Sequence, residues 1–350
     1  MHTYTKEMKK CISLAKKALG KTSPNPLVGC VVLNADGDVI ATGYHKKYGD
    51  FHAERDALNK IQNAKGCTLV VNLEPCCHQG KTPPCTDIII EKGIKTVVYG
   101  MKDPNPIVSG RGLKILKDAG ISVVGPVLEN ECRLLNEVFI KNKTQEKIFV
   151  VLKTATTADG KISTHNGDSK WITSEKARNY ARKLRRNYDA ILTSSSTVIA
   201  DNPTMNHKVK VILDRELKTD INSNIYKQGK IYVFHDKKLK PKNKSKRITY
   251  LPAPIKDGKL DAEFILNKIF ELGIMSVFVE SGGKLSGSFL PYADKIYQFI
   301  APKILNDNSG KSCFDGDKAD EISECRNFEI ESTKLLDKDL LITYKSPKLL

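Results

Sequence analysis

Long apolar segments are absent from this sequence. No stretch approaches the roughly 20 consecutive apolar residues that a membrane-spanning helix needs. The segment Met1–Glu7 also lacks the apolar core of a secretion signal. We therefore expect a soluble, cytoplasmic chain with no membrane partner.

Regularly spaced cysteines are also missing. The nine cysteines are scattered along 350 residues, which argues against the disulfide framework of a small secreted domain. Three of them, Cys76, Cys77 and Cys85, lie close together. Such a cluster in an intracellular chain favours a metal site or catalysis.

Acidic residues are too few to balance the basic ones. The chain has 57 Lys and Arg residues against 40 Asp and Glu residues, which gives a net charge of +17. A basic chain suits a nucleic-acid partner, but here the lysines are spread over the whole length, and the densest run, 237–246, contains no aromatic residue. We therefore expect no nucleic-acid partner, and an acidic small substrate such as a phosphate ester explains the charge equally well.

The length and the alternation of elements predict two α/β domains. Domains usually hold roughly 100–200 residues. In the first half, apolar residues at helical spacing alternate with short apolar strands, which predicts a three-layer α/β sandwich whose last helix covers Glu129–Asn142. The polar stretch Lys141–Lys147 is the best candidate linker, so the predicted domains are residues 1–145 and 146–350. The second domain is again α/β and begins with the strand Ile148–Thr154.

One histidine, one glutamate and two cysteines give the strongest chemical signal. His52-Ala53-Glu54 opens a predicted helix, and Cys76 and Cys85 each follow a proline. One histidine and two cysteines make a three-ligand zinc site that leaves a fourth position for water, as catalytic zinc sites do. Zinc lowers the pKa of such a water to about 7, and Glu54 can pass its proton to a leaving amine. This combination is typical of zinc deaminases.

The neighbouring residues leave alternatives open. The cysteines could be unrelated core residues, or His78 could complete a closed structural zinc site. Cys77 competes with Cys76 as a ligand but would tend to point elsewhere, because the two are adjacent. The compact deaminase signature has two residues between its cysteines, whereas eight lie between Cys76 and Cys85. We expect this insertion, residues 77–84, to form a loop beside the metal that shapes the substrate pocket.

The first half contains further motifs around this constellation. Together the motifs are Pro24–Gly29, His52–Glu54, Leu73–Cys85, Asp103–Pro106 and Gly110–Gly112. They strongly resemble the deaminase half of the bifunctional riboflavin-biosynthesis deaminase/reductases. The resemblance implies a cytidine-deaminase-like α/β/α domain that binds Zn²⁺ through His52, Cys76 and Cys85, uses Glu54 in catalysis and contacts the base through Asn25. It also implies that residues 77–84 help to hold the substrate and that a thiol at Cys77, where the family often has serine, leaves the site undisturbed.

The residues of the second half are less informative by themselves. The turn Glu280–Gly287 follows a buried strand, and its backbone amides could bind a phosphate. A tight strand-to-helix turn needs glycine in any case, so this motif alone decides nothing. Trp171, the only tryptophan, is either a core anchor or a platform for a flat cofactor ring. Thr173 or Ser174 is placed to cap the following helix.

Motifs of the second half also resemble the reductase half of that family. They are Asp159–Lys161, Ser169–Ser174, Ala190–Val198, Asp201–Pro203 and Glu280–Gly287. The resemblance implies a dihydrofolate-reductase-like α/β domain that uses NADPH. It implies cofactor contacts at Ala155, Trp171, Thr197, Asp201, Gly282, Gly283, Lys284, Leu285, Ser286, Gly287 and Ser288. It implies substrate contacts at Ser169, Arg185, Met205, Lys208 and Glu280.

One of these positions departs from the family pattern. Lys208 stands where the family often has arginine. A lysine still offers a point charge to a phosphate but loses the two-pronged hydrogen bonding of a guanidinium. Arg185 is therefore the safer phosphate ligand.

The leading hypothesis is a bifunctional enzyme that acts on a phosphoribosylamino-pyrimidine. The resemblance implies zinc-dependent deamination of 2,5-diamino-6-(5-phosphoribosylamino)pyrimidin-4-one, then NADPH-dependent reduction of the ribosyl to the ribityl side chain. It also implies a homo-oligomer. One alternative is an RNA- or nucleoside-editing deaminase with an appended binding domain, which the basic charge favours slightly. The other is a non-catalytic zinc-stabilised binding protein, for which Glu54→Gln would leave all function intact.

Overall fold

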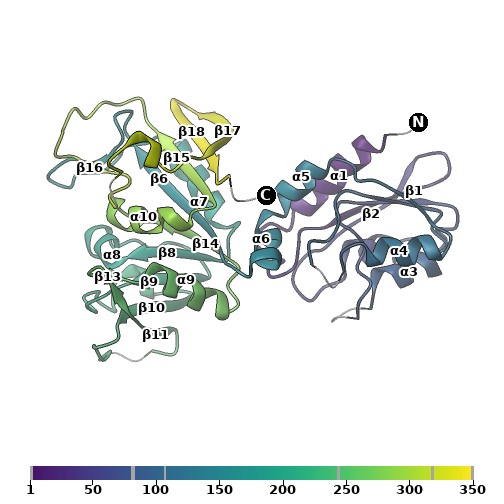
Figure 1. Cartoon of the computed structure of the whole chain (residues 1–350), viewed down its shortest axis with the longest axis horizontal. Helices are drawn as coiled ribbons and strands as arrows, with labels where there is room; N and C mark the ends of the chain where they lie inside the picture. Colours follow the sequence, from purple (N-terminus) through teal and green to yellow (C-terminus); the bar gives the residue numbers. More distant parts are fainter. Residues whose placement is uncertain (1–2, 80–82, 106–107, 243–244, 317–318, 348–350) are drawn as a thin grey trace. The chain divides into compact units, whose positions relative to one another are not determined.

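The chain forms two compact units. The computed structural model describes residues 3–79, 83–105, 108–242, 245–316 and 319–347, and the chain divides into Met1–Glu146 and Lys147–Leu350. Each unit has its own sheet (Figure 1). In the described part of the chain, no helix combines the length and the apolar character that crossing a membrane requires.

A five-stranded sheet lies at the centre of the first unit. Its order is β2-β1-β3-β4-β5. Strand β1 pairs antiparallel with β2 and β3, whereas β3, β4 and β5 run parallel. The strands are β1 (Gly29–Leu33), β2 (Val39–Tyr44), β3 (Thr68–Val71), β4 (Thr96–Tyr99) and β5 (Ser122–Val124).

Helices cover both faces of this sheet, as the sequence predicted. They are α1 (Thr5–Lys16), α2 (Ala53–Leu58), α3 (Cys85–Glu91), α4 (Arg111–Asp118), α5 (Glu129–Leu135) and α6 (Glu137–Gln145). Helix α1 packs against α5, and α2, α3 and α4 pack in succession on the other face (Figure 1). The apolar stripe of α1 is buried in the common core at Met8, Cys11, Ile12 and Ala15. This periodicity explains why the segment is helical.

The secondary structure at the end of this unit differs from the prediction, although the boundary between the units, at Glu146 and Lys147, falls within the predicted linker. The single helix predicted over Glu129–Asn142 is divided at Asn136, whose backbone is not helical (φ −109°, ψ 20°) and whose side chain bonds to Leu27. Its Oδ1 accepts from the Leu27 N–H at 2.7 Å, and its Nδ2 donates to the Leu27 carbonyl at 3.1 Å. Most of the predicted linker Lys141–Lys147 is helical, because α6 continues to Gln145 and Lys141 is buried.

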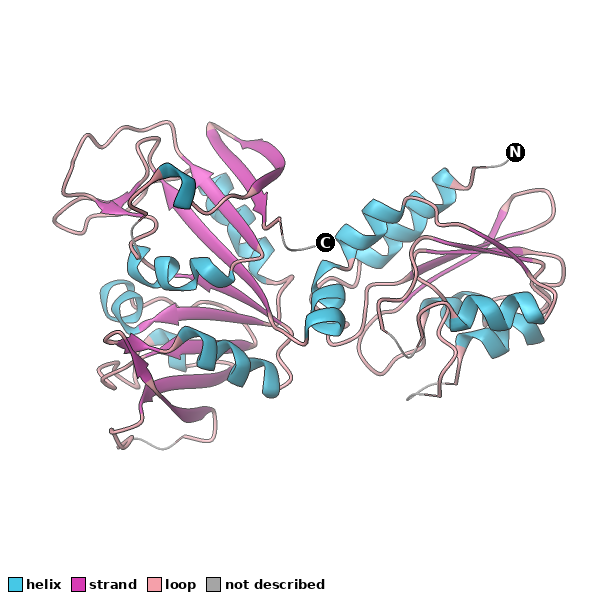
Figure 2. Cartoon of the chain, viewed as in Figure 1, coloured by secondary structure: helices cyan, strands magenta, loops and turns pink. Residues whose placement is uncertain are grey.

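The second unit is built on a nine-stranded sheet (Figure 2). Its order is β11-β10-β9-β8-β14-β6-β15-β18-β17. The strands from β11 to β15 in this order run parallel, and β18 and β17 complete the edge antiparallel. The strands are β6 (Phe149–Thr156), β8 (Ala190–Ser194), β9 (Val209–Leu213), β10 (Lys230–Asp236), β11 (Ile248–Ala253), β14 (Ser276–Glu280), β15 (Lys295–Ile300), β17 (Glu329–Leu336) and β18 (Asp339–Lys345).

The remaining elements of the second unit are helices and short strand pairs. The helices are α7 (Glu175–Arg185), α8 (Ser195–Asp201), α9 (Ala262–Glu271) and α10 (Gly283–Phe289). The strand pairs are β7 (Lys161–Ser163) with β16 (Lys311–Ser312) and β12 (Ile255–Lys256) with β13 (Lys259–Leu260). Helices α9 and α10 share one core with the central strands. Ser174 caps α7 by accepting from the Ala177 N–H at 3.3 Å, which confirms one of the two predicted caps.

Candidate active sites

Three side chains predicted to bind zinc come together in the first unit. His52 immediately precedes α2, Cys76 lies beyond the end of β3, and Cys85 is the first residue of α3. The Nδ1 atom of His52 is 3.3 Å from the Sγ atom of Cys76 and 3.4 Å from that of Cys85. All three ligand atoms lie within 4.8 Å of one another.

These distances fit a tetrahedral zinc ion. With bonds of about 2.0 Å to nitrogen and 2.3 Å to sulfur, tetrahedral angles separate the two atoms by about 3.5 Å. A set of one imidazole and two thiolates also matches the ligands that zinc prefers. Three protein ligands leave one position for water or substrate, which is the arrangement of a catalytic site.

The two thiols are electrostatically coupled. A hydrogen bond from Cys85 and, to a smaller extent, the interaction with His52 together lower the pKa of the Cys76 thiol to about 4, although burial acts in the opposite direction. The same contact with Cys76, together with burial, raises the pKa of Cys85. The hydrogen bond to Cys76 raises the pKa of His52. A divalent cation would replace these shared protons, because metal ligation needs the deprotonated forms.

Among the residues described, the alternative ligands Cys77 and His78 lie outside the candidate metal group. His78 lines the pocket beside this group. The three-ligand open site is thus favoured over a closed site completed by His78. Residues 80–82 of the predicted 77–84 loop lie outside the described residues.

Glu54 lies next to this group in a protected position. It is in the first turn of α2, and 3% of it is exposed. Burial raises the pKa of its carboxyl to about 7, and the charge of the Cys76 thiolate acts in the same direction. A carboxyl group that titrates near neutral pH can both accept and release a proton during turnover.

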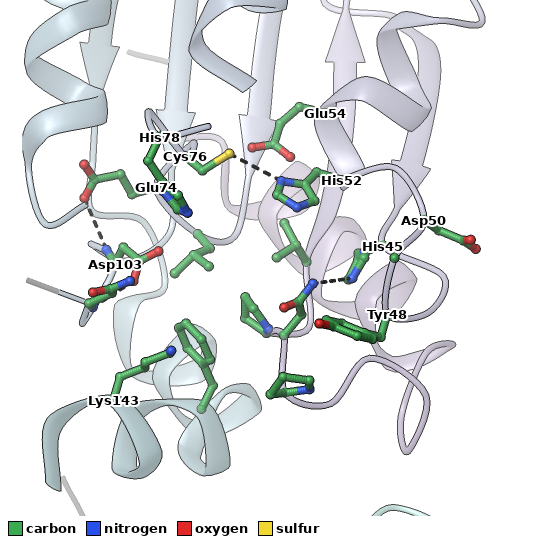
Figure 3. A pocket seen from close by; sticks show the side chains of 18 residues that line it. His45, Tyr48, Asp50, His52, Glu54, Glu74, Cys76, His78, Asp103 and Lys143 are labelled. Atoms are coloured by element: carbon green, nitrogen blue, oxygen red, sulfur yellow. Dashed lines mark hydrogen bonds between the residues drawn. The ribbon is translucent and has the colours of Figure 1, made fainter. Parts of the chain in front are cut away.

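A pocket of about 270 Å³ opens in front of these residues (Figure 3). Its lining includes Asn25, Glu54, Cys76 and Asp103, with Lys143 across the pocket from His52 and Cys76. The predicted base-contacting residue Asn25 therefore shares one cavity with the candidate metal group. The pocket holds both polar and apolar side chains, as a site for a small polar ring requires.

The sequence reasoning missed His45, which orients Asn25. The Nδ1 atom of His45 is 3.0 Å from the Phe51 carbonyl oxygen, which only accepts, so Nδ1 carries the proton. The Nε2 atom then accepts from the Nδ2 of Asn25 at 3.2 Å. This leaves the carbonyl oxygen of Asn25 as an acceptor for a ligand amine. A lone histidine seven positions before His52 gave no signal of this role.

A second polar cluster lies at the carboxyl ends of central strands in the second unit. The Nε and Nη2 atoms of Arg185 donate to the two carboxylate oxygens of Glu280 at 2.6 and 2.8 Å. Lys153, which lies beside Glu280 in the register of β6 and β14, donates to it at 3.2 Å. Burial opposes the charge of Glu280, but the two cations lower its pKa to about 2. Ligands of open α/β sheets bind beyond this edge.

The predicted cofactor turn joins a group of hydroxyls at the same edge. The Oγ atom of Ser281 lies 2.8 Å from that of Ser194 and 3.2 Å from the Oγ1 of Thr197. A Cβ atom on Gly283 would lie 2.1 Å from the Ser312 carbonyl oxygen, so this glycine is needed for packing. Gly282 instead faces open space. Gly287 is also needed for packing, because a Cβ atom there would lie 2.5 Å from the Asp315 carbonyl oxygen, so only Gly282 of this turn is free to approach a ligand.

Trp171 is not a core anchor. It is 60% exposed, and the guanidinium of Arg178 lies 4.2 Å from its ring centre. Lys170, the residue before it, pairs with the predicted cofactor residue Asp201 at 3.0 Å. This exposure leaves an aromatic face available to a flat ligand.

The other predicted residues of the second unit come from several segments of the chain. Ala155 lies near the carboxyl end of β6, and Ser169 lies in the loop before Trp171. Met205 is buried, with a positive φ of 40°. Among the residues described, no hydrogen bond or ion pair joins Met205 or Lys208 to the Glu280 cluster.

Comparisons with known proteins identify the families to which both units are similar. Residues 1–101 match the family model for the cytidine and deoxycytidylate deaminase zinc-binding region. Residues 148–342 match the model for the RibD C-terminal domain.

Similarity to individual proteins extends over nearly the whole chain. The chain is 40% identical to riboflavin biosynthesis protein RibD of Aquifex aeolicus, with 97% of each chain covered. It is 38% identical to RibD of Actinobacillus pleuropneumoniae, covering 96% of this chain and 94% of that protein. Among solved structures, it is similar to the diaminohydroxyphosphoribosylaminopyrimidine deaminase/5-amino-6-(5-phosphoribosylamino)uracil reductase of Thermotoga maritima, with a TM-score of 0.88, 39% identity and 99% of each chain covered.

The fold and the two sites define a class of protein. A cytidine-deaminase-like unit with a candidate His-Cys-Cys zinc centre is followed by a dihydrofolate-reductase-like α/β unit. The chain is therefore a bifunctional enzyme with deaminase and reductase units. It belongs to the RibD family of riboflavin biosynthesis proteins.

Proposed function

We propose that the first unit hydrolytically deaminates 2,5-diamino-6-(5-phosphoribosylamino)pyrimidin-4-one. The observation that carries this proposal is the shared pocket in which Glu54 and Asn25 lie beside His52, Cys76 and Cys85. The name of the Thermotoga maritima relative supports the choice of substrate. Family membership also favours this substrate over an RNA or a free nucleoside.

The residues of the pocket have separate roles in the reaction. Zinc, held by His52, Cys76 and Cys85, would supply a water of lowered pKa, about 7 in such sites. Glu54 would accept a proton at a carboxylate oxygen and give one to the leaving amine, so that the amine departs as ammonia. Asn25, oriented by His45, accepts a hydrogen bond from the ring and holds the amine-bearing carbon in place.

The second unit would reduce the ribosyl chain of the deaminated product with NADPH. In the reaction, a hydride would pass to the sugar C1′ and open the ring to the ribityl chain. The Ser281 hydroxyl group and the free face of Gly282 support cofactor binding at the strand edge. The cluster of Arg185, Glu280 and Lys153 supports substrate binding there. Because Arg185 uses the Nε hydrogen and one Nη2 hydrogen on Glu280, three of its five N–H donors, two on Nη1 and one on Nη2, remain for a phosphate.

The assembly and location of the enzyme follow from the same resemblance. We propose a homo-oligomer in the cytoplasm that meets a phosphate-bearing small substrate. The net charge of +17 suits such a substrate without any nucleic-acid partner.

The Glu54→Gln variant tests the proposal for the first unit. We expect ammonia release from the diamino substrate to fall at least about a hundredfold, within the usual contribution of general acid–base catalysis. Zinc content and NADPH-dependent reduction of the deaminated product should persist. Glu91→Gln, which removes an exposed carboxylate of α3, is the matched control and should retain both steps. Deamination by Glu54→Gln at nearly the wild-type rate would exclude this role.

A further inference from the structure

A buried carboxylate beside the metal ligands has no part in the chemistry described so far. Glu74 follows β3 and comes two residues before Cys76, and only 2% of it is exposed. Its Oε2 atom accepts from the backbone N–H groups of Asp103 at 3.2 Å and Gly110 at 2.9 Å. Its Oε1 atom accepts from those of Gly112 at 3.1 Å and Leu113 at 3.4 Å.

Three of these bonds, from Gly110, Gly112 and Leu113, satisfy donors at the start of helix α4. The residue before the helix, Gly110, has no side chain to cap it. The first N–H groups of a helix lack partners within the helix, and here Glu74 supplies the acceptor from another part of the chain. A carboxylate at this end is also stabilised by the helix dipole.

The segment held by Glu74 is one wall of the deaminase pocket. Asp103 and Asn105 line the pocket, and Asp103 Oδ1 accepts from the Asn105 N–H at 2.8 Å. Figure 3 shows Asp103 bonded to Glu74 on the side of the pocket away from His45 and Tyr48. The carboxylate thus touches the backbone of the wall itself.

Glu74 also lies on the segment that carries the candidate metal ligand Cys76. Glu74 N–H donates to the Met101 carbonyl at 2.9 Å, which fixes it to the strand end that leads into the wall. A Cβ atom on Gly112 would lie 2.2 Å from the Pro75 carbonyl oxygen, so α4 packs directly against the residue before Cys76. The metal-ligand segment and the pocket wall therefore meet at Glu74.

We propose that Glu74 is a positioning residue that fixes the wall bearing Asp103 and Asn105 at a set place relative to Cys76. Glu74 lines the pocket but is not part of the candidate metal group, and it acts on substrate affinity through this wall. The inference rests on the proposed deaminase function, because substrate affinity is its readout. In Glu74→Gln, one acceptor oxygen becomes an NH₂ group that faces backbone donors, so two of the four bonds are lost.

Steady-state kinetics of the full-length, zinc-loaded Glu74→Gln variant test this proposal. We expect KM for the deaminase substrate to rise about tenfold to a hundredfold, the range for loss of buried charge-assisted hydrogen bonds. The kcat value and the zinc content should stay close to wild type. Asp118→Asn, which removes an exposed carboxylate at the other end of α4, should change neither constant.

Two further measurements separate positioning from a general structural role. In an Asn105→Ala background, Glu74→Gln should raise KM much less, because both changes disrupt the same wall. Hydrogen exchange of the wild-type enzyme should show slow exchange at the amides of Gly110, Gly112 and Leu113. Rapid exchange there would overturn the proposal even if the variant does not fold.

The possible failures are distinguishable. A wild-type chain that releases no ammonia contradicts the proposed function itself. A wild-type chain that deaminates normally, with unchanged KM in Glu74→Gln, contradicts only the inference. Loss of zinc from Glu74→Gln would also overturn it, because Glu74 would then support the metal ligands and not the wall.

Discussion

Lys210 offers a quantitative test of the second unit's core. It lies in β9 with 1% of its surface exposed, and its Nζ donates to the carbonyl oxygens of Thr204 at 2.9 Å and Ile225 at 2.7 Å. No carboxylate takes part in these bonds. Burial lowers the pKa of this ammonium to about 8.

The lowered pKa makes the stability of the second unit depend on pH. An unfolded lysine has a pKa of about 10.4, so between pH 8 and 10.4 the unfolded chain binds more protons at this site than the folded one. The free energy of unfolding therefore rises with pH across this window. Below pH 8 the folded chain buries a charged lysine, so the free energy of unfolding is lowered by the whole cost of that burial. The difference between pKa values of about 10.4 and about 8, at about 1.36 kcal/mol for each tenfold change in proton affinity, amounts to about 3 kcal/mol.

The perturbation is Lys210→Met, which keeps the length of the side chain and removes the charge. We expect the free energy of unfolding of the wild type to rise by up to about 3 kcal/mol relative to the variant between pH 7 and 10.5. Urea unfolding followed by fluorescence reports on this unit, because Trp171 is the only tryptophan. The other titrating groups are the same in both proteins, so their contribution is removed when the two free energies of unfolding are subtracted.

Lys240→Met provides the matched control, since Lys240 is exposed. Its difference from the wild type should stay flat over the same pH range. A flat curve for Lys210→Met would refute the argument, because it would mean that the folded enzyme holds Lys210 at an ordinary pKa.

Two other predictions concern the candidate sites. Cys76→Ser should lose most of the zinc measured by metal analysis and nearly all deaminase activity. Cys77→Ser should keep both. Equal zinc loss in the two variants would exclude the assigned ligand set. Glu280→Gln removes the partner of Arg185 and Lys153, so NADPH oxidation with the deaminated substrate should fall about tenfold to a hundredfold, while ammonia release stays unchanged. Unchanged NADPH oxidation would remove Glu280 from the reductase site.

The metal group could be predicted because its signature lies in short, rigid pieces of sequence. His52 and Glu54 share the start of one helix, and each cysteine follows a proline at the end or start of an element. The α/β class could also be predicted, because the spacing of the apolar residues changes between helical and strand periods along the chain. The break between helices α5 and α6 at Asn136 could not be predicted, because it depends on contacts with Leu27, 109 positions away.

The supporting residues of both sites could not be found from spacing. His45 acts on Asn25 across 20 positions, and Lys153 reaches Glu280 across 127. Glu74 bonds to backbone N–H groups, which every residue other than proline carries, so no side-chain pattern marks its partners. Such roles depend on which strand ends the sheet brings together.

The central claim is that this one chain carries out deamination and reduction in sequence. The most direct test follows ammonia and NADPH together while the purified wild-type enzyme converts the diamino substrate. We predict one ammonia released and one NADPH oxidised per substrate, with NADPH oxidation lagging behind ammonia. Ammonia release with no NADPH oxidation, or NADPH oxidation before any ammonia appears, would contradict the account.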